Sequence, residues 1–250
     1  MKTMSAILAV TILIGSGAMA RAGVVIDEQV TTTRGSAPPT VQKVQELVQG
    51  HQKKFIRNDG SDGVIMIDLD KKVAIVTDPA KKMYFERPLP PEGSTSGQQL
   101  DVDFKTTGKS SKILSYECRE YEGKAKTAMA EFSAHGCFST SAPGAAEYSA
   151  FNQAAKGMAP HMPDGIPLTL VSTTKIRSDV KIPGLTDEQM ARLQQMNQPQ
   201  VAKRLVTKIA TANLPASTFS VPAGYTRGSL PTPGSGTVPA SPATRPQSPE

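Results

Sequence analysis

Two cysteines and a nearby histidine are the residues whose types and spacing most invite chemistry in this chain. Cys118 and Cys137 are the only cysteines, and His135 lies two residues before the second. A zinc site would need a CxxC pair or a second close histidine, and the sequence has neither. In an exported protein an even, minimal cysteine count favours one disulfide, which would stabilise the fold by about 3 kcal/mol. We therefore expect a Cys118–Cys137 disulfide, with a catalytic or metal-binding role as the rival interpretation.

No other residues match a catalytic or metal-binding pattern. The run from Gly93 to Gly97 places Thr95 where a nucleophile elbow needs serine. Four aspartates gather in a turn-rich stretch, but their spacing misses the calcium-loop pattern, and aspartate is a preferred turn residue; they are Asp59, Asp62, Asp68 and Asp70. We expect no catalytic residue, no metal and no cofactor, and a protein that is not an enzyme.

The first 22 residues have the form of a secretory signal peptide. Lys2 supplies the positive charge, residues 6–14 form an uncharged apolar run, and Ala18, Ala20 and Ala22 fit A-x-A cleavage. The apolar run is too short to span about 30 Å of hydrocarbon, and no lipidation cysteine lies near the cleavage point. We expect a periplasmic or secreted protein with no transmembrane segment in its mature form.

The charge of the chain argues against nucleic acid as a partner. The formal net charge is +6, and removing Lys2 and Arg21 with the leader gives 6 − 2 = +4. Lysines are spread along the chain among acidic residues, without the basic stripe and interleaved aromatics typical of nucleic-acid binding.

The elements that must position any site are mainly β-strands. Short Val-, Ile- and Thr-rich runs are separated by Gly, Pro and Asp turns, as in an antiparallel meander. The run 41–48 also fits a helical stripe, but its neighbours favour a strand. The expected strands are 24–33, 41–48, 63–69, 73–77, 82–86, 111–123, 127–138, 166–182 and 200–212.

The two cysteines constrain one hairpin. A tight turn at Gly123 would place Cys118 opposite a residue near position 129 rather than opposite Cys137. Either the turn lies nearer Thr127, or Cys137 lies past the strand end and the chain loops back.

The clearest predicted helix spans 139–159. Ser141 is a candidate N-cap, Pro143 lies close to N1, and Tyr148, Phe151 and Met158 share one face. This stripe has two interpretations: ordinary core packed on the sheet, or a lid over an apolar pocket. A second, shorter helix is predicted over 186–197, because Thr186 and Gln189 have capping-box spacing.

We expect residues 23–226 to form one domain and residues 227–250 a disordered tail. The tail is rich in proline, serine and threonine and has almost no large apolar residues. It cannot bury enough surface to offset the entropy of ordering it.

Four sequence blocks resemble a known family. In order they are GVIMIDLDKKVAIVTDPAKKMYFERP, SSKILSYECREYEGK, PDGIPLTLVSTTK and NLPASTFSVPAGY, within residues 24–226. The set resembles DUF4412, a family of uncharacterised bacterial envelope proteins, which is similar in turn to the LolA/LolB-like lipoprotein-carrier superfamily. The resemblance implies a mainly β (α+β) fold, a strongly curved antiparallel sheet or incomplete barrel, with one or two helices on its concave side. Relatives of this kind hold acyl chains in that concavity.

Two functional hypotheses follow. The first is a non-enzymatic periplasmic protein that binds a lipid or another apolar ligand inside the curved sheet. The second is an envelope scaffold with a filled core, which would engage another envelope protein. Candidate ligand-binding residues, taken from the alternation of the strands and from the helical stripe, are Ile65, Ile67, Leu69, Val73, Ile75, Phe132, Tyr148, Phe151, Met158 and Leu168.

Overall fold

The chain builds one large sheet. The structure, a computed structural model, describes residues 22–58, 63–91, 102–127, 130–156, 161–177, 186, 188–189 and 198–229. Nearly all of the predicted signal peptide, Met158 and nearly all of the predicted tail lie outside these ranges. Within them the strands are β1 Gly23–Arg34, β2 Thr40–Gln49, β3 Gln52–Arg57, β4 Val64–Asp68, β5 Val73–Asp78, β6 Met83–Pro88, β7 Asp103–Ile113, β8 Tyr116–Lys126, β9 Ala130–Ser139, β10 Ile166–Ile176, β11 Gln200–Ala212 and β12 Thr226–Arg227.

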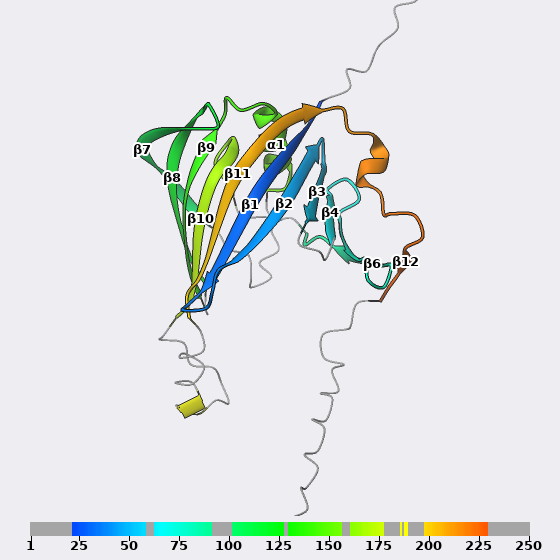
Figure 1. Ribbon diagram of the computed structural model, residues 1–250, viewed down its shortest axis with the longest axis horizontal. Helices are drawn as coiled ribbons and strands as arrows, with labels where there is room; N and C mark the ends of the chain where they lie inside the picture. Colours follow the sequence, from blue (N-terminus) through cyan, green and yellow to red (C-terminus); the bar gives the residue numbers. More distant parts are fainter. Residues whose placement is uncertain are drawn as a thin grey trace, which may run out of the picture.

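The sheet is twelve-stranded, curved and unclosed (Figure 1). Its order is β12-β6-β5-β4-β3-β2-β1-β11-β10-β9-β8-β7, and every pairing is antiparallel except that of β12 with β6. Two meanders therefore meet where β1 pairs with β11, which lies far along the sequence. The curved antiparallel sheet predicted from the sequence is confirmed. So is the strand interpretation of residues 41–48, since these residues form most of β2.

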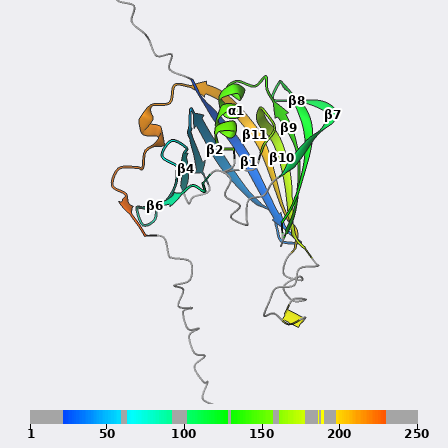
Figure 2. The same ribbon diagram turned by 180° about the vertical axis from the view of Figure 1, so that it is seen from behind.

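An α-helix lies over the concave face of the sheet (Figure 2). This helix, α1, spans Ala145–Ala154 and contacts β1, β2 and β10. Its Tyr148 and Phe151 are buried in the main apolar core, together with Val24, Ile26 and other strand residues. These two residues of the predicted helical stripe are therefore part of the ordinary core.

The start of the helix was predicted wrongly. Ser141 is not the N-cap: the cap residue is Gly144, in a left-handed conformation with φ 77°. The reason lies in the hydroxyls of Ser139 and Ser141, which donate to the carbonyl oxygen of Glu117 at 2.6 and 3.4 Å. Ser139 thus ends β9, and the helix begins only after Gly144 has reversed the chain.

The capping box predicted for the second helix is present. Thr186 N–H donates to Oε1 of Gln189 at 3.0 Å, and Gln189 N–H donates to Oγ1 of Thr186 at 3.3 Å. The remainder of that helix lies outside the described residues.

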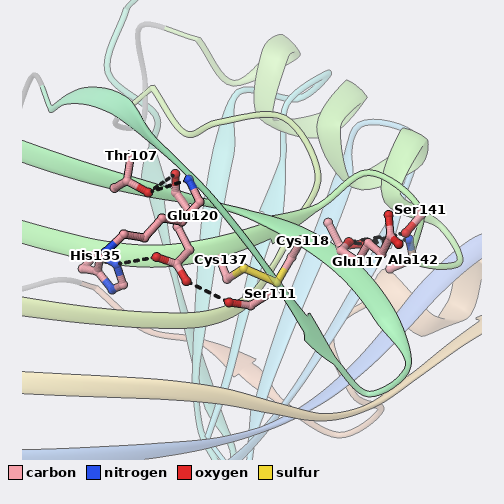
Figure 3. Close-up of a disulfide and its surroundings, with 11 residues drawn as sticks. Thr107, Ser111, Glu117, Cys118, Glu120, His135, Cys137, Ser141 and Ala142 are labelled. Atoms are coloured by element: carbon pink, nitrogen blue, oxygen red, sulfur yellow. Dashed lines mark hydrogen bonds and ion pairs between the residues drawn. A yellow bond between two sulfur atoms is a disulfide. The ribbon is translucent and has the colours of Figure 1, made fainter.

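The disulfide is confirmed, and the first of the two turn alternatives is correct. Cys118 and Cys137 are bonded, with their Cα atoms 5.3 Å apart. The β8–β9 hairpin turns after Thr127, and this turn places Glu120 opposite Cys137. Cys118 lies two residues before Glu120 on the same face of β8, so it is the diagonal neighbour of Cys137. The bridge thus joins two adjacent strands (Figure 3).

The polar residues beside the disulfide do not form a catalytic triad. Ser111 Oγ donates to Oε1 of Glu120 at 2.8 Å, and His135 Nε2 lies 3.6 Å from Oε2 of the same carboxylate (Figure 3). Serine and histidine therefore both contact the acid, whereas a triad needs the histidine between them. Both sulfur atoms are used in the bridge, which removes the thiolate that the rival interpretation needs.

A second layer covers part of the convex face. The 3₁₀ helix η1, Ala216–Phe219, contacts β3, and Lys54 Nζ donates to the carbonyl oxygen of Thr218 at 2.7 Å. Leu47 and Met66 pair with Lys54 on this face and are almost fully buried. The chain then runs on to β12, as Figure 1 shows.

The predicted tail begins inside the sheet. Arg227 belongs to β12, and Gly228 N–H donates to the carbonyl oxygen of Tyr84 at 2.8 Å. The proposed boundary at residue 227 thus falls within a strand pairing, and residues 230–250 lie outside the described ranges.

Candidate functional site

Burial changes along the concave face in the same direction on β1 and β2. On β1, Val24 and Ile26 are fully buried beneath α1, Glu28 is 2% exposed, and Val30 is only half-buried. The same sequence of burial runs along β2 from Val48 through Glu46, to a half-buried residue at position 44. The last buried inward position on each of these two strands is therefore a charged residue, between the packed core and the rest of the concave face.

Four charged side chains from four strands meet at this level. Arg204 on β11 binds Glu28 with two hydrogen bonds of 2.6 Å, from Nε and from Nη2. Nη2 also donates to Oε2 of Glu46 at 2.8 Å. The second oxygen of Glu46 contacts Nζ of Lys53. We call Glu28, Glu46, Lys53 and Arg204 the ionic cluster.

Aromatic rings close the cluster on the side of the helix. Nζ of Lys53 lies 4.3 Å from the ring centroid of Tyr148 and 5.2 Å from that of Phe151. Phe55, the next inward residue on β3, has its ring centroid 5.1 Å from the same atom. An ammonium group removed from water is stabilised by ring faces at this range, so the helix and the cluster hold each other in place.

Burial and pairing shift the pKa values of the cluster in opposite directions. Burial alone would raise the pKa of the Glu46 carboxyl, but the attraction of Lys53 and Arg204 outweighs it and lowers this pKa to about 2. For Glu28, burial outweighs the opposing pull of Arg204, and the pKa is raised. Burial lowers the pKa of Lys53, yet Glu46 more than offsets this, so that the pKa is raised. Glu46 is thus firmly charged, and Glu28 is the acid of the cluster that takes up a proton most readily.

Beyond the cluster the concave face carries apolar side chains that are only partly covered. Phe55, Ile65, Val76 and Phe85 form one row across β3–β6, because each is paired with the next in register. Phe55, Ile65 and Phe85 are half-buried, and Val76 is 42% exposed. A row of this kind, open on the inside of a curved sheet, suits contact with an apolar molecule.

The concave face is also hollow on the other side of the helix. A cleft of about 480 Å³ separates α1 from the β7–β8 hairpin. Phe104 and Tyr121 line it from the strands, and Ser149 and Asn152 line it from the helix. Its lining is more polar than the row on β3–β6, so the helix does not fill the concavity on this side.

The structure divides the predicted site residues into four groups. Tyr148, Phe151, Leu168 and Leu69 lie in the main core, with Leu168 fully buried. Ile65 and Ile67 lie on the concave face by register. Phe132 also lies on that face, paired with Ala125 near the ends of the strands, and Met158 lies outside the described residues.

Val73 and Ile75 were assigned to the wrong face. The register pairs Asp68 with Val73 and Met66 with Ile75, so both residues point away from Ile65. The cause is the four-residue turn between β4 and β5, in which Asp68 Oδ1 accepts the N–H of Lys71 at 2.9 Å. A turn with an even number of residues pairs odd-numbered positions of one strand with even-numbered positions of the next. The residues of β5 that point inward are therefore the even-numbered ones paired with Ile65 and Ile67, not Val73 and Ile75.

The ionic cluster was missed by sequence reasoning, although a signal was present. On β1 and β2 the inward positions read Val24-x-Ile26-x-Glu28-x-Val30 and Val44-x-Glu46-x-Val48. A glutamate in the inward phase of an apolar strand must be buried with a partner. Two such glutamates on adjacent strands therefore indicated a buried ionic site, even though their basic partners could not be named.

A membrane-spanning helix and a metal-binding cluster are both absent from the described residues. None of their helices is long and apolar enough to cross a membrane. Nor do they contain a group of three or more His, Cys, Asp or Glu side chains placed to hold a metal ion.

Comparisons with known proteins add little to this geometry. No protein-family model matches the chain, and no curated protein matches it, so the likeness of its sequence blocks to DUF4412 stays a resemblance. Among solved structures, 84% of the chain aligns with PNGF-II at 8% identity and a TM-score of 0.39, but it spans only 31% of that protein.

Two smaller proteins align over most of their length. A LolA superfamily protein from Nitrosomonas europaea gives 9% identity and a TM-score of 0.33, with 79% of this chain and 90% of that one covered. A DUF1329 family protein from Desulfovibrio piger gives 7% identity and a TM-score of 0.34, with 79% and 89% covered. Likeness at this level does not define function, which must be argued from the site itself.

Proposed function

We propose that this protein is a non-enzymatic, exported carrier or receptor that binds a lipid-like apolar molecule on the concave face of its curved sheet. The observation that carries the proposal is the row of Phe55, Ile65, Val76 and Phe85 on that face. These side chains lie on the inside of the sheet and yet are not sealed by α1. The likeness of the sequence to envelope proteins agrees with this function.

A matched pair of substitutions tests the proposal. Val76 on β5 is 42% exposed on the concave face, and Val41 on β2 is 53% exposed on the convex face. Val76→Asp places a charge against the bound molecule, whereas Val41→Asp places the same charge in water. We expect Val76→Asp to weaken binding of a fluorescent fatty-acid probe about tenfold, for a loss near 1.4 kcal/mol, and Val41→Asp to leave it unchanged. Equal affinity in both variants would contradict the proposal.

A second candidate, an envelope scaffold, is favoured by one observation. The α1 end of the concave face is packed solid with Tyr148, Phe151 and their strand partners, as a filled core would be. Native mass spectrometry of the protein purified from its own cells separates the two functions. Co-purified lipid supports the carrier, whereas a bare protein that captures no fatty acid supports the scaffold.

Export is a separate part of the proposal. It rests on the form of residues 1–22 and on the disulfide, which persists in oxidising compartments. N-terminal sequencing of the protein from culture tests it. A mature chain that starts near Gly23 supports export, and retention of Met1 contradicts it.

A further inference from the structure

We propose that Arg204 receives the head group of the molecule bound on the concave face, and that this head group is anionic, a carboxylate or a phosphate at the end of an apolar chain. The inference rests on the proposed function and adds to it the chemical class of the ligand. It is carried by the unused donors of Arg204 and by the side chains around them.

Arg204 is only partly used by its neighbours. Nε and Nη2 make three hydrogen bonds to the carboxylates of Glu28 and Glu46. Among the residues that the structure describes, no group accepts a hydrogen bond from Nη1. The side chain is 27% exposed, whereas those of Glu28 and Glu46 are 0% exposed. The Nη1 edge of the guanidinium therefore keeps two N–H donors, and charge-assisted hydrogen bonds from such donors favour an anion such as a carboxylate or a phosphate.

Apolar side chains flank this edge. Val30 on β1 and Leu170 on β10 are the residues paired with Arg204 on its two neighbouring strands, and both are half-buried. Val44, paired with Glu28, is the corresponding half-buried residue of β2. An anion bound at Nη1 would thus lie where its attached chain could extend over these side chains, and an isolated inorganic anion would leave them exposed.

Charge balance predicts that the protein takes up a proton when it binds an anion. Two carboxylates and two cations sum to zero within the ionic cluster, and Tyr148, whose pKa burial raises, adds no charge at neutral pH. These are the titratable groups whose charges act on Arg204; Arg57, the next inward residue of β3 after Phe55, is paired with Val44 and is exposed to solvent. A bound anion would leave one uncompensated negative charge in a poorly solvated site, which is costly. Protonation of Glu28, which is hydrogen-bonded to Arg204, would remove this excess negative charge, and burial already raises the pKa of its carboxyl.

The first experiment compares chain-end chemistry on the unmodified protein. Isothermal titration calorimetry with dodecanoate, dodecyl phosphate and 1-dodecanol holds the apolar chain constant. We expect one or both anions to bind at least about tenfold more tightly than the alcohol. A preference for dodecanoate identifies a free fatty acid, and a preference for dodecyl phosphate identifies a phospholipid head group. Equal binding of all three overturns the inference and leaves the proposed function standing, whereas no binding of any of them overturns the proposed function.

The second experiment removes the donors. Glu28→Gln/Arg204→Met takes out one charge of each sign and leaves Glu46 paired with Lys53, so this variant keeps the cluster neutral. We expect it to bind 1-dodecanol as the wild type does and to lose the preference for anions. Lys203→Met is the matched control, because Lys203 adjoins Arg204 but is exposed on the opposite face. An anion preference that survives in the double variant, or disappears in the control, overturns the inference.

The third experiment measures the number of protons taken up on binding. Titrations at one pH in two buffers of different ionisation enthalpy measure proton uptake. We expect about one proton per bound anion in the wild type and none in Glu28→Gln, because only a protonating Glu28 restores neutrality. A purely structural role for the cluster predicts no uptake in either protein, and that result overturns the proposed coupling.

Discussion

Replacing Glu46 by glutamine should destabilise this protein far more than the same change at Glu28. Both carboxylates are buried, both accept hydrogen bonds from Arg204, and glutamine has nearly the same shape. They differ in their other neighbour. Glu46 is the counter-ion of Lys53, which is 6% exposed and enclosed by aromatic rings, whereas Glu28 has only Arg204.

The magnitude follows from the pKa of Glu46, which falls from 4.5 in the unfolded chain to about 2 in the fold. A shift of this size corresponds to about 3 kcal/mol of stability at neutral pH. The same figure lies in the range of about 3–5 kcal/mol for removing one partner of a buried ion pair. For a domain of this size the expected fall in Tm is roughly 6–12 °C. For Glu28, whose pKa is raised, the charged form is already poorly accommodated, and we expect a change within about 1 kcal/mol.

The assay is chemical denaturation at several pH values. A carboxyl with a lowered pKa contributes stability above pH 4.5 and loses it as the pH falls towards 2. The difference between wild type and Glu46→Gln should therefore be constant near neutral pH and about half as large by pH 3. Glu28, with its raised pKa, behaves in the opposite sense: its charged form costs stability at neutral pH, and this cost is relieved as the pH falls through its folded pKa. Equal losses for the two variants at pH 7, or a Glu46→Gln loss that does not depend on pH, would refute this account of the cluster.

Three further outcomes are expected. Replacing both Cys118 and Cys137 by serine should lower stability by about 3 kcal/mol, checked by urea denaturation, with thiol labelling of the unreduced wild type finding no free cysteine. Phe151→Ala should cost about 3–5 kcal/mol, because Phe151 is 3% exposed in the main core; a loss below 1 kcal/mol would show that the helix is a loosely held lid. Truncation after Ser229 should leave Tm unchanged, whereas truncation after Tyr225 removes β12 and should lower Tm by about 2–4 °C. Equal Tm values for the two truncations would show that β12 contributes nothing.

The strands could be predicted from the sequence because their signals are local. A Val- and Thr-rich run such as Gly23–Arg34 favours a pleated strand whatever it pairs with, and residues 200–212 were predicted with the bounds that β11 has. The helix start was lost because Ser141 has two competing partners, the end of its own helix and the Glu117 carbonyl of another strand. Local capping rules describe only the first. The face of Ile75 was lost for a similar reason, since one residue more or less in a turn reverses every side chain of the strand that follows.

The ionic cluster shows the limit of such local reasoning most clearly. Glu28 and Arg204 are separated by almost the whole domain in sequence, and they meet only because β1 and β11 close the two meanders against each other. A fold that needed only stability would fill these inward positions with apolar residues, since replacing buried ion pairs by well-packed apolar residues is often neutral or stabilising. The cluster instead lies at the last buried level of the concave face and leaves one edge of Arg204 open towards the apolar surface beyond it. Because a buried ion cluster is a poor source of stability, its position at the border of the core favours a role in binding at the open part of the concave face.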